Sequence, residues 1–136
     1  MIHLVNIARS ALRERAKVKT RSPQWERVRN AFLAKVEAAG GGCAACSEKK
    51  RLQVHHEKPY HLHPELELEE SNLIVLCMGP NECHLLIGHG SYFSAYDPLV
   101  VDHAGMYLAA VRKGKAGAAE RRDVVALAKA ARQEGP

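Results

Sequence analysis

Four cysteines, arranged as two pairs, constrain the fold of this chain more than any other feature. Cys43 and Cys46 flank two alanines, and Cys77 and Cys83 flank the five residues Met-Gly-Pro-Asn-Glu. A C-x2-C spacing lets one tight turn present two thiolates to a tetrahedral ion, and the turn at Gly79-Pro80-Asn81 can bring the second pair together. The sequence therefore predicts one structural zinc ion. Four thiolate ligands leave no position on it open for water.

Composition supports the need for such a metal. The chain has 136 residues and 46% apolar residues, but only 5% aromatic ones, so its core must rest on Leu, Val, Ile and Ala. The centre of the chain is too polar to fold around hydrophobic side chains alone, and zinc would supply the missing stabilisation. The alternative for Cys77, at the end of an apolar run, is a small buried hydrophobic residue. We expect a single domain over 1–136, with a core over 43–93 between regions 1–42 and 94–136.

The compartment follows from what the sequence lacks. The segment 1–9 is too short and too interrupted for a secretory signal, and no apolar run approaches the roughly 18 residues of a membrane span. We therefore expect a cytoplasmic protein with no membrane partner. In that reducing compartment, four cysteines favour metal binding over disulfides.

Charge is unevenly distributed along the chain. The net charge is +5; residues 1–36 contain nine Lys or Arg and two Glu, and residues 111–132 contain seven Lys or Arg and two acids. Residues 64–82 contain five Glu and no Lys or Arg. Two basic ends suit a polyanionic partner that crosses the middle, with Arg13, Arg15 and Lys17 as candidate nucleic-acid contacts. The alternative is an ordinary solvated helix face.

Periodicity predicts an α+β fold. Apolar spacing favours a helix over 3–19, and Ser22-Pro23 has the pattern of an N-cap that opens a second helix, which ends at Gly40. Strands are expected around 52–54 and 73–76, joined by a loop over 61–71, with a helix opening at 83–87 and helices over 102–113 and 117–132. The second helix should bury one apolar stripe, formed by Trp25, Val28, Phe32, Leu33 and Val36.

Histidines and one asparagine lie among these elements in a pattern that suits phosphodiester hydrolysis. His55-His56 ends the first strand, Asn72 precedes the second, and His84 opens the following helix. Neutral imidazole can take a proton from water, while a divalent ion stabilises charge on the phosphate and the departing oxygen. Because neighbours on a strand point to opposite faces, one histidine of the doublet can face a metal while the other meets the water.

These residues resemble the HNH endonuclease family. The resemblance lies in Leu52-Gln-Val-His-His56 with Pro59, Asn72-Leu-Ile-Val-Leu-Cys77 and Cys83-His84, and it covers 43–93. It is strongest to the zinc-containing members found in bacteriophages and mobile elements. It implies a small ββα-metal (His-Me finger) core stapled by the four-cysteine zinc and flanked by N- and C-terminal helices.

The resemblance also implies a role for each matching residue. His55 and His84 match metal ligands, His56 matches the general base, and Asn72 matches the residue that positions the histidine-bearing loop. A further ligand is expected at position 88, which is Gly88 here, with His89 next to it. Either the helix shifts its register locally and His89 binds the metal, or His89 serves another role, such as holding a phosphate.

The expected function is a metal-dependent HNH endonuclease that hydrolyses DNA with low sequence specificity, in a bacterial or phage-infected cell. Imidazole ligands accept Mg²⁺ or Mn²⁺ and bind Ni²⁺ or Zn²⁺ more tightly, so the catalytic ion stays open. Two alternatives remain: a catalytically silent, zinc-stabilised DNA-binding or assembly module, and a nuclease acting on RNA. Nicking as against double-strand cutting is also open, as is a homodimer or a larger phage or host nucleic-acid-processing assembly.

Overall fold

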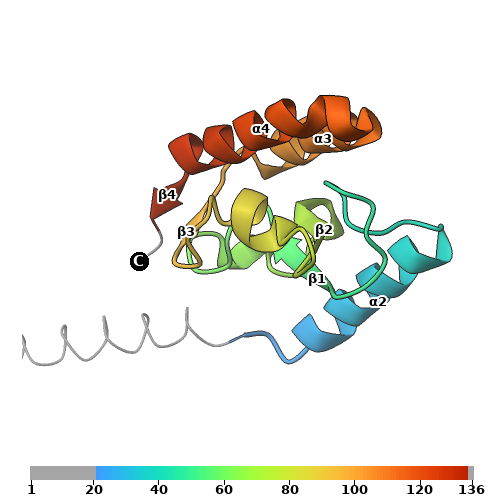
Figure 1. Ribbon diagram of the computed structural model, residues 1–136. Coiled ribbons are helices and arrows are strands. Elements are labelled where there is room, and N and C mark those ends of the chain that lie inside the picture. Colours follow the sequence, from blue (N-terminus) through green and yellow to red (C-terminus); the bar gives the residue numbers. More distant parts are fainter. Residues whose placement is uncertain (1–20, 135–136) are drawn as a thin grey trace, which may run out of the picture.

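A computed structural model describes residues 21–134 and confirms the α+β class. The predicted helix over 3–19, with Arg13, Arg15 and Lys17, lies outside the described residues. The centre of the fold is an antiparallel pair of strands, β1 (Leu52–His56) and β2 (Leu73–Cys77). Helices α3 and α4 lie side by side over one side of this pair, and α2 lies on the other (Figure 1).

The histidine doublet lies at one end of the strand pair. The register pairs Leu52 with Cys77 and His56 with Leu73, so the histidine doublet lies at the end of the ladder where the long connection begins. That connection was predicted as a loop and contains two short 3₁₀ turns, η1 (Pro64–Leu66) and η2 (Glu70–Asn72). All five residues of β2 are buried, because the strand lies against the core formed with α3, α4 and the turn at His84–Gly88.

After β2 the chain forms one π-helical turn, η3 (His84–Gly88), where the sequence predicted the opening of an ordinary helix. The backbone N–H of His89 donates to the carbonyl of His84 at 3.0 Å, which is the i→i+5 bond of a π-helix. This turn inserts one extra residue between the first and last side chains of the turn. The register shift considered for His89 is therefore present.

The helix after Ser22-Pro23 is α2 (Trp25–Ala38). The prediction of Ser22 as its N-cap is wrong: Gln24 occupies that position, and the Ser22 hydroxyl instead accepts a hydrogen bond from the Gln24 N–H at 3.2 Å. The predicted apolar stripe lies on one face but is only half-buried, because α2 contacts little besides β1. The helix ends where predicted, before Gly40 with its φ of +76°.

The C-terminal part consists of α3 (Val100–Arg112), the 3₁₀ turn η4 (Gly114–Gly117) and α4 (Ala118–Ala131), close to the predicted ranges. Short strands β3 (Ala95–Tyr96) and β4 (Gln133–Glu134) pair antiparallel and join the two ends of this part. The core lies between the strand pair, η3 and the two helices, and includes Ile74, Leu76, Ile87, Val100, Ala104, Tyr107 and Val124. Within residues 21–134, no helix has the length and apolar character needed to cross a membrane.

Candidate functional site

The four predicted zinc ligands lie together. The sulfur atoms of Cys43, Cys46, Cys77 and Cys83 are all within 4.8 Å of one another, and Cys46 Sγ lies 3.6 Å from Cys77 Sγ. Zn–S bonds of about 2.3 Å place the sulfurs of a tetrahedral site about 3.8 Å apart. All four are free thiols. The cluster therefore has the donor set and the spacing of a structural zinc site.

The four neighbouring thiols shift one another's pKa values. A hydrogen bond from Cys83 lowers the pKa of Cys43 to about 5, whereas burial raises the pKa of Cys46 to about 11. The hydrogen bond to Cys43, together with burial, raises the pKa of Cys83. A cation would relieve this competition, because it favours the thiolate form of every ligand at once.

A second group of side chains that could hold a metal ion is formed by His55, His84 and His89. Their ring nitrogens lie within 4.8 Å of one another. His84 Nε2 lies 3.0 Å from His55 Nδ1 and 3.2 Å from His89 Nε2. Ligand nitrogens at about 2.0–2.1 Å from a tetrahedral zinc ion stand about 3.3 Å apart. The structure thus brings together all three histidines that the sequence predicted as ligands of the second metal.

The hydrogen bonds behind two of these rings direct their lone pairs to the same point. His89 Nδ1 donates to the carbonyl of Ala95 at 2.7 Å, and His84 Nδ1 lies 3.0 Å from Gln53 Oε1. Both oxygens accept only, so each ring carries its proton on Nδ1 and its lone pair on Nε2. Two lone pairs facing each other at 3.2 Å repel unless a cation or a proton lies between them. This is the arrangement of outer partners that orients histidine ligands in metal sites.

Glycine at position 88 makes this convergence possible. A Cβ there would lie 3.1 Å from Leu76 Cδ1, 3.2 Å from His55 Cε1 and 3.3 Å from His84 Cδ2. A side chain at position 88 would therefore push these neighbours, two of them clustered histidines, out of place. The π-helical turn carries the chain one residue further, so that His89 supplies the third nitrogen.

The histidine cluster favours neutral rings. Burial, followed by the charges of His84 and His89, holds the pKa of His55 well below its ordinary value. Burial, then the charge of His89, lowers the pKa of His84 to about 4, and burial also lowers the pKa of His89. His55 Nδ1 faces the cluster, 3.0 Å from His84 Nε2, whereas His55 Nε2 is, among residues 21–134, the buried side-chain nitrogen or oxygen without a hydrogen-bond partner. Neutral rings with free lone pairs are the form that binds a metal ion.

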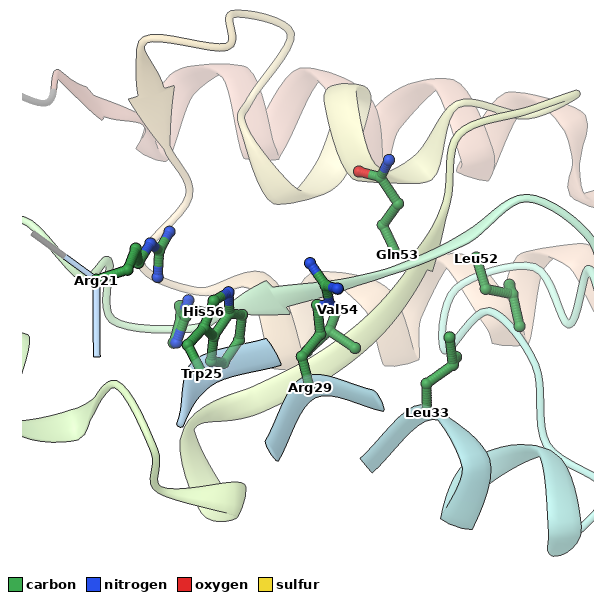
Figure 2. A pocket seen from close by; sticks show the side chains of 8 residues that line it. All are labelled: Arg21, Trp25, Arg29, Leu33, Leu52, Gln53, Val54 and His56. Carbon is green, nitrogen blue, oxygen red and sulfur yellow. The ribbon is translucent and has the colours of Figure 1, made fainter. Parts of the chain in front are cut away.

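His56 points to the other face of β1, as strand alternation predicted. Its ring stacks on Trp25 of α2 at a centroid distance of 4.4 Å, and its Nε2 donates to the carbonyl of Glu67 at 2.9 Å. Since Nε2 carries the proton, the lone pair is on Nδ1. Burial lowers the pKa of His56, so the ring is neutral at pH 7. Figure 2 shows His56 beside Trp25 and Arg21.

Side chains from both faces of β1 line one cavity. A hollow of about 330 Å³ is lined by His55, His56, His84 and His89, and also by Arg21, Tyr60, His61 and Phe93. Tyr60 and Phe93 give this cavity an aromatic rim, and Phe93 is exposed. His56 and the three clustered histidines therefore open onto the same space.

Asn72 clamps the connection between the strands. Its Oδ1 accepts from the Lys58 N–H at 2.9 Å, and its Nδ2 donates to the Lys58 carbonyl at 3.0 Å and to the Leu66 carbonyl at 3.4 Å. Leu66 directly precedes Glu67, whose carbonyl orients His56. The side chain thus ties together both ends of the loop that carries the partner of His56.

Several supporting residues were not predicted. Gln53 has a signal in the sequence, because it lies two positions before His55 on the same face of a strand. The carbonyls of Ala95 and Glu67 and the ring of Trp25 have none, since tertiary packing alone brings them to the site. Among residues 21–134, no other histidine joins either cluster, although His61 lines the cavity. His61 is exposed, and His63 lies 3.2 Å from Glu65.

His103, for which the sequence suggested no role, forms a buried pair with Asp97. His103 Nδ1 lies 2.5 Å from Asp97 Oδ2, and Asp97 is fully buried. The Asp97 carboxylate also accepts from the Leu99 N–H, and its own N–H donates to the Gly88 carbonyl at 3.0 Å. This pair therefore holds the start of α3 against the end of η3, next to the Ala95 carbonyl that orients His89.

Comparisons of this chain with families of known proteins, with curated proteins and with solved structures found no match.

Proposed function

We propose that the protein is a metal-dependent HNH endonuclease that hydrolyses phosphodiester bonds of DNA. The observation that supports this most is the convergence of three neutral histidines, two with lone pairs fixed toward each other, at a cavity that also contains His56. In this proposal β1, β2 and η3 form a ββα-metal core in which one π-helical turn takes the place of the helix opening.

In this proposal His56 is the general base, and its neighbours hold it in position. His56 Nδ1 takes the proton of the attacking water, since Nε2 is already committed to the Glu67 carbonyl. Trp25 and Glu67 hold the ring in place, and Asn72 holds the loop that carries Glu67. A low pKa keeps this base neutral at pH 7, although it also limits its strength as a proton acceptor.

His55, His84 and His89 would hold the divalent ion through Nδ1, Nε2 and Nε2. The ion would supply stabilisation of the negative charge that develops on the phosphate and on the departing oxygen. The cysteine cluster would hold a separate structural zinc, because four thiolates leave no open position for a substrate. The net charge of +5 suits a polyanionic substrate.

Supercoiled plasmid incubated with the full chain tests the proposal. Cleavage should appear with Mg²⁺, Mn²⁺, Ni²⁺ or Zn²⁺ and should be absent without an added ion. Nicked circles should precede linear DNA, because one site cuts one strand at a time. A structured RNA incubated in parallel tests the alternative substrate.

Absence of DNA cleavage with all four ions would refute the proposal. If the chain then still bound DNA, it would be a zinc-stabilised binding module. Cleavage of RNA alone would make the protein a ribonuclease.

A further inference from the structure

A second hollow lies between α2 and β1, on the side of His56 away from the metal-binding histidines. It measures about 370 Å³, within the range of pockets that hold small ligands. Trp25, Arg29 and Leu33 of α2 form one wall, and Leu52, Val54 and His56 of β1 form the other. Figure 2 shows Arg29 extending from α2 toward Val54, with Arg21, Trp25 and His56 gathered at one end.

The charge of this hollow is positive and poorly compensated. Arg21 and Arg29 are its charged side chains, and no described carboxylate lines it. Arg21 has a long contact of 3.8 Å with Glu67, whereas Arg29 forms no ion pair with any carboxylate in residues 21–134. The Arg29 Nε–H donates to Asn30 Oδ1 at 3.3 Å, which leaves the two terminal nitrogens for another acceptor. A half-buried guanidinium with unused donors is a strong phosphate-binding group.

The hollow adjoins the cavity of the histidine cluster. Arg21, Val54 and His56 line both spaces, so they form a shared wall. An extended polyanion lying in the hollow would therefore lie next to His56, at the border of the cavity that contains the three clustered histidines. A strand long enough to extend from the hollow to the cavity could contact both, whereas a free anion could occupy only the hollow.

We propose that the hollow between α2 and β1 is a subsite for the sugar-phosphate backbone next to the cleaved bond, with Arg29 as its principal phosphate contact. This inference rests on the proposed function for the identity of the strand, but DNA binding tests it without any cleavage. Backbone contacts hold a strand in register and do not read its sequence. The subsite therefore predicts binding that is tight and indifferent to base order.

The experiment measures binding of labelled duplex DNA to the zinc-loaded full chain without added divalent ions, over a range of salt concentrations. Arg29→Ala should reduce the slope of log affinity against log salt by about 0.9, the value for one phosphate contact. Arg29→Gln, which keeps most of the side chain length, should do the same and guards against a folding defect in the alanine variant. Arg27→Ala is the matched control, because Arg27 is exposed on the same helix and does not line the hollow.

Trp25 gives a second readout, since it is the sole tryptophan of the chain and lines the hollow. DNA should change its fluorescence in the parent and in Arg27→Ala, and the change should require more DNA in both Arg29 variants. Inorganic phosphate should displace no more DNA than chloride does at equal ionic strength.

Three results would overturn the inference. These are an unchanged salt slope in both Arg29 variants, an equal decrease of slope in Arg27→Ala, or selective displacement of DNA by inorganic phosphate. The last result would assign the hollow to a free anion. Failure of plasmid cleavage with intact Arg29-dependent binding would refute the proposed function and leave the subsite standing.

Discussion

At the scale of single residues, the site depends on small differences of position. His55 and His56 are adjacent in sequence, yet one joins the metal-binding cluster and the other stacks on α2. The same holds for Gly88 and His89, where the residue without a side chain makes room for the ring of the next one. Strand alternation explains the first pair, and the extra residue of the π-helical turn explains the second.

Gly88→Ala should weaken metal binding at the histidine cluster. The new Cβ would lie 3.2 Å from His55 Cε1 and 3.1 Å from Leu76 Cδ1, so these side chains must move away. Calorimetric titration with Ni²⁺ or Mn²⁺ should show a lower affinity, while zinc held by the cysteines stays unchanged. Gly105→Ala in α3 is the control: nothing lies within 4 Å of its Cβ, and it should raise stability by about 0.5–1 kcal/mol. Equal metal affinity in Gly88→Ala and the parent would contradict this account of the glycine.

At the scale of elements, β1, β2, η3 and the turns that flank them bring two clusters of ionisable side chains together within residues 43–89. The folded pKa values of His55, His84 and His89 all lie below the ordinary value, with His84 at about 4. The unfolded chain therefore binds protons more readily than the folded chain as the pH falls. The stability contributed by neutral rings is present above about pH 6.5 and is lost as the pH falls toward 4.

This linkage predicts a pH-dependent difference between the parent and His84→Gln. Glutamine does not titrate, so acidification from pH 7 to pH 5 should destabilise the parent more than the variant. Urea denaturation without added divalent ions, at several pH values, measures the difference in unfolding free energy. A difference that stays constant over this range would show that His84 does not resist protonation.

Cys43→Ser or Cys83→Ser should unfold the centre of the protein. Structural zinc contributes about 10–16 kcal/mol of apparent binding free energy in small modules, comparable with the stability of a whole domain. Metal analysis of the parent should find one tightly bound zinc ion per chain, and thermal melting of either variant should lose its cooperative transition. A zinc-free parent with an unchanged melting curve would eliminate the structural zinc.

The sequence predicted the metal-binding side chains better than it predicted their surroundings. The spacing of the four cysteines was sufficient to predict that they lie together, because metal ligands are few and chemically distinctive. These cysteines are Cys43, Cys46, Cys77 and Cys83. The prediction of Ser22 as an N-cap was wrong, because a Ser-Pro pair can lie in the turn before a helix as well as at its first residues. The contacts of His56 with Trp25 and with the Glu67 carbonyl join segments far apart in sequence, and no local pattern encodes them.

At the scale of the whole molecule, positive charge and two adjoining cavities together indicate where a polyanion would lie. Arg21 and Arg29 line the hollow beside the site, whereas Arg13, Arg15 and Lys17 lie outside residues 21–134. The contribution of those three residues to nucleic-acid binding therefore stays a prediction from sequence.

Reversing the charge at Arg13, Arg15 and Lys17 together should flatten the salt dependence of DNA binding by roughly two to three units of slope, since each phosphate that is no longer neutralised removes about 0.9. The effect should be similar for unrelated DNA sequences, because backbone contacts carry no base information. Salt titrations of DNA affinity measure it. An unchanged slope would leave these residues as an ordinary solvated surface.

The central claim is that His56 acts as a base beside a metal ion held by His55, His84 and His89. The most direct test measures the rate of plasmid cleavage against Mn²⁺ concentration for the parent, His56→Ala, His84→Ala and His63→Ala, the last a control for a partly exposed histidine outside the cluster. The parent and His63→Ala should reach the same plateau, and His84→Ala should need far more Mn²⁺. His56→Ala should bind the ion normally yet remain about 10² to 10⁴ slower at saturation. A saturated rate for His56→Ala within a few-fold of the parent, or an unchanged Mn²⁺ requirement for His84→Ala, would contradict the account.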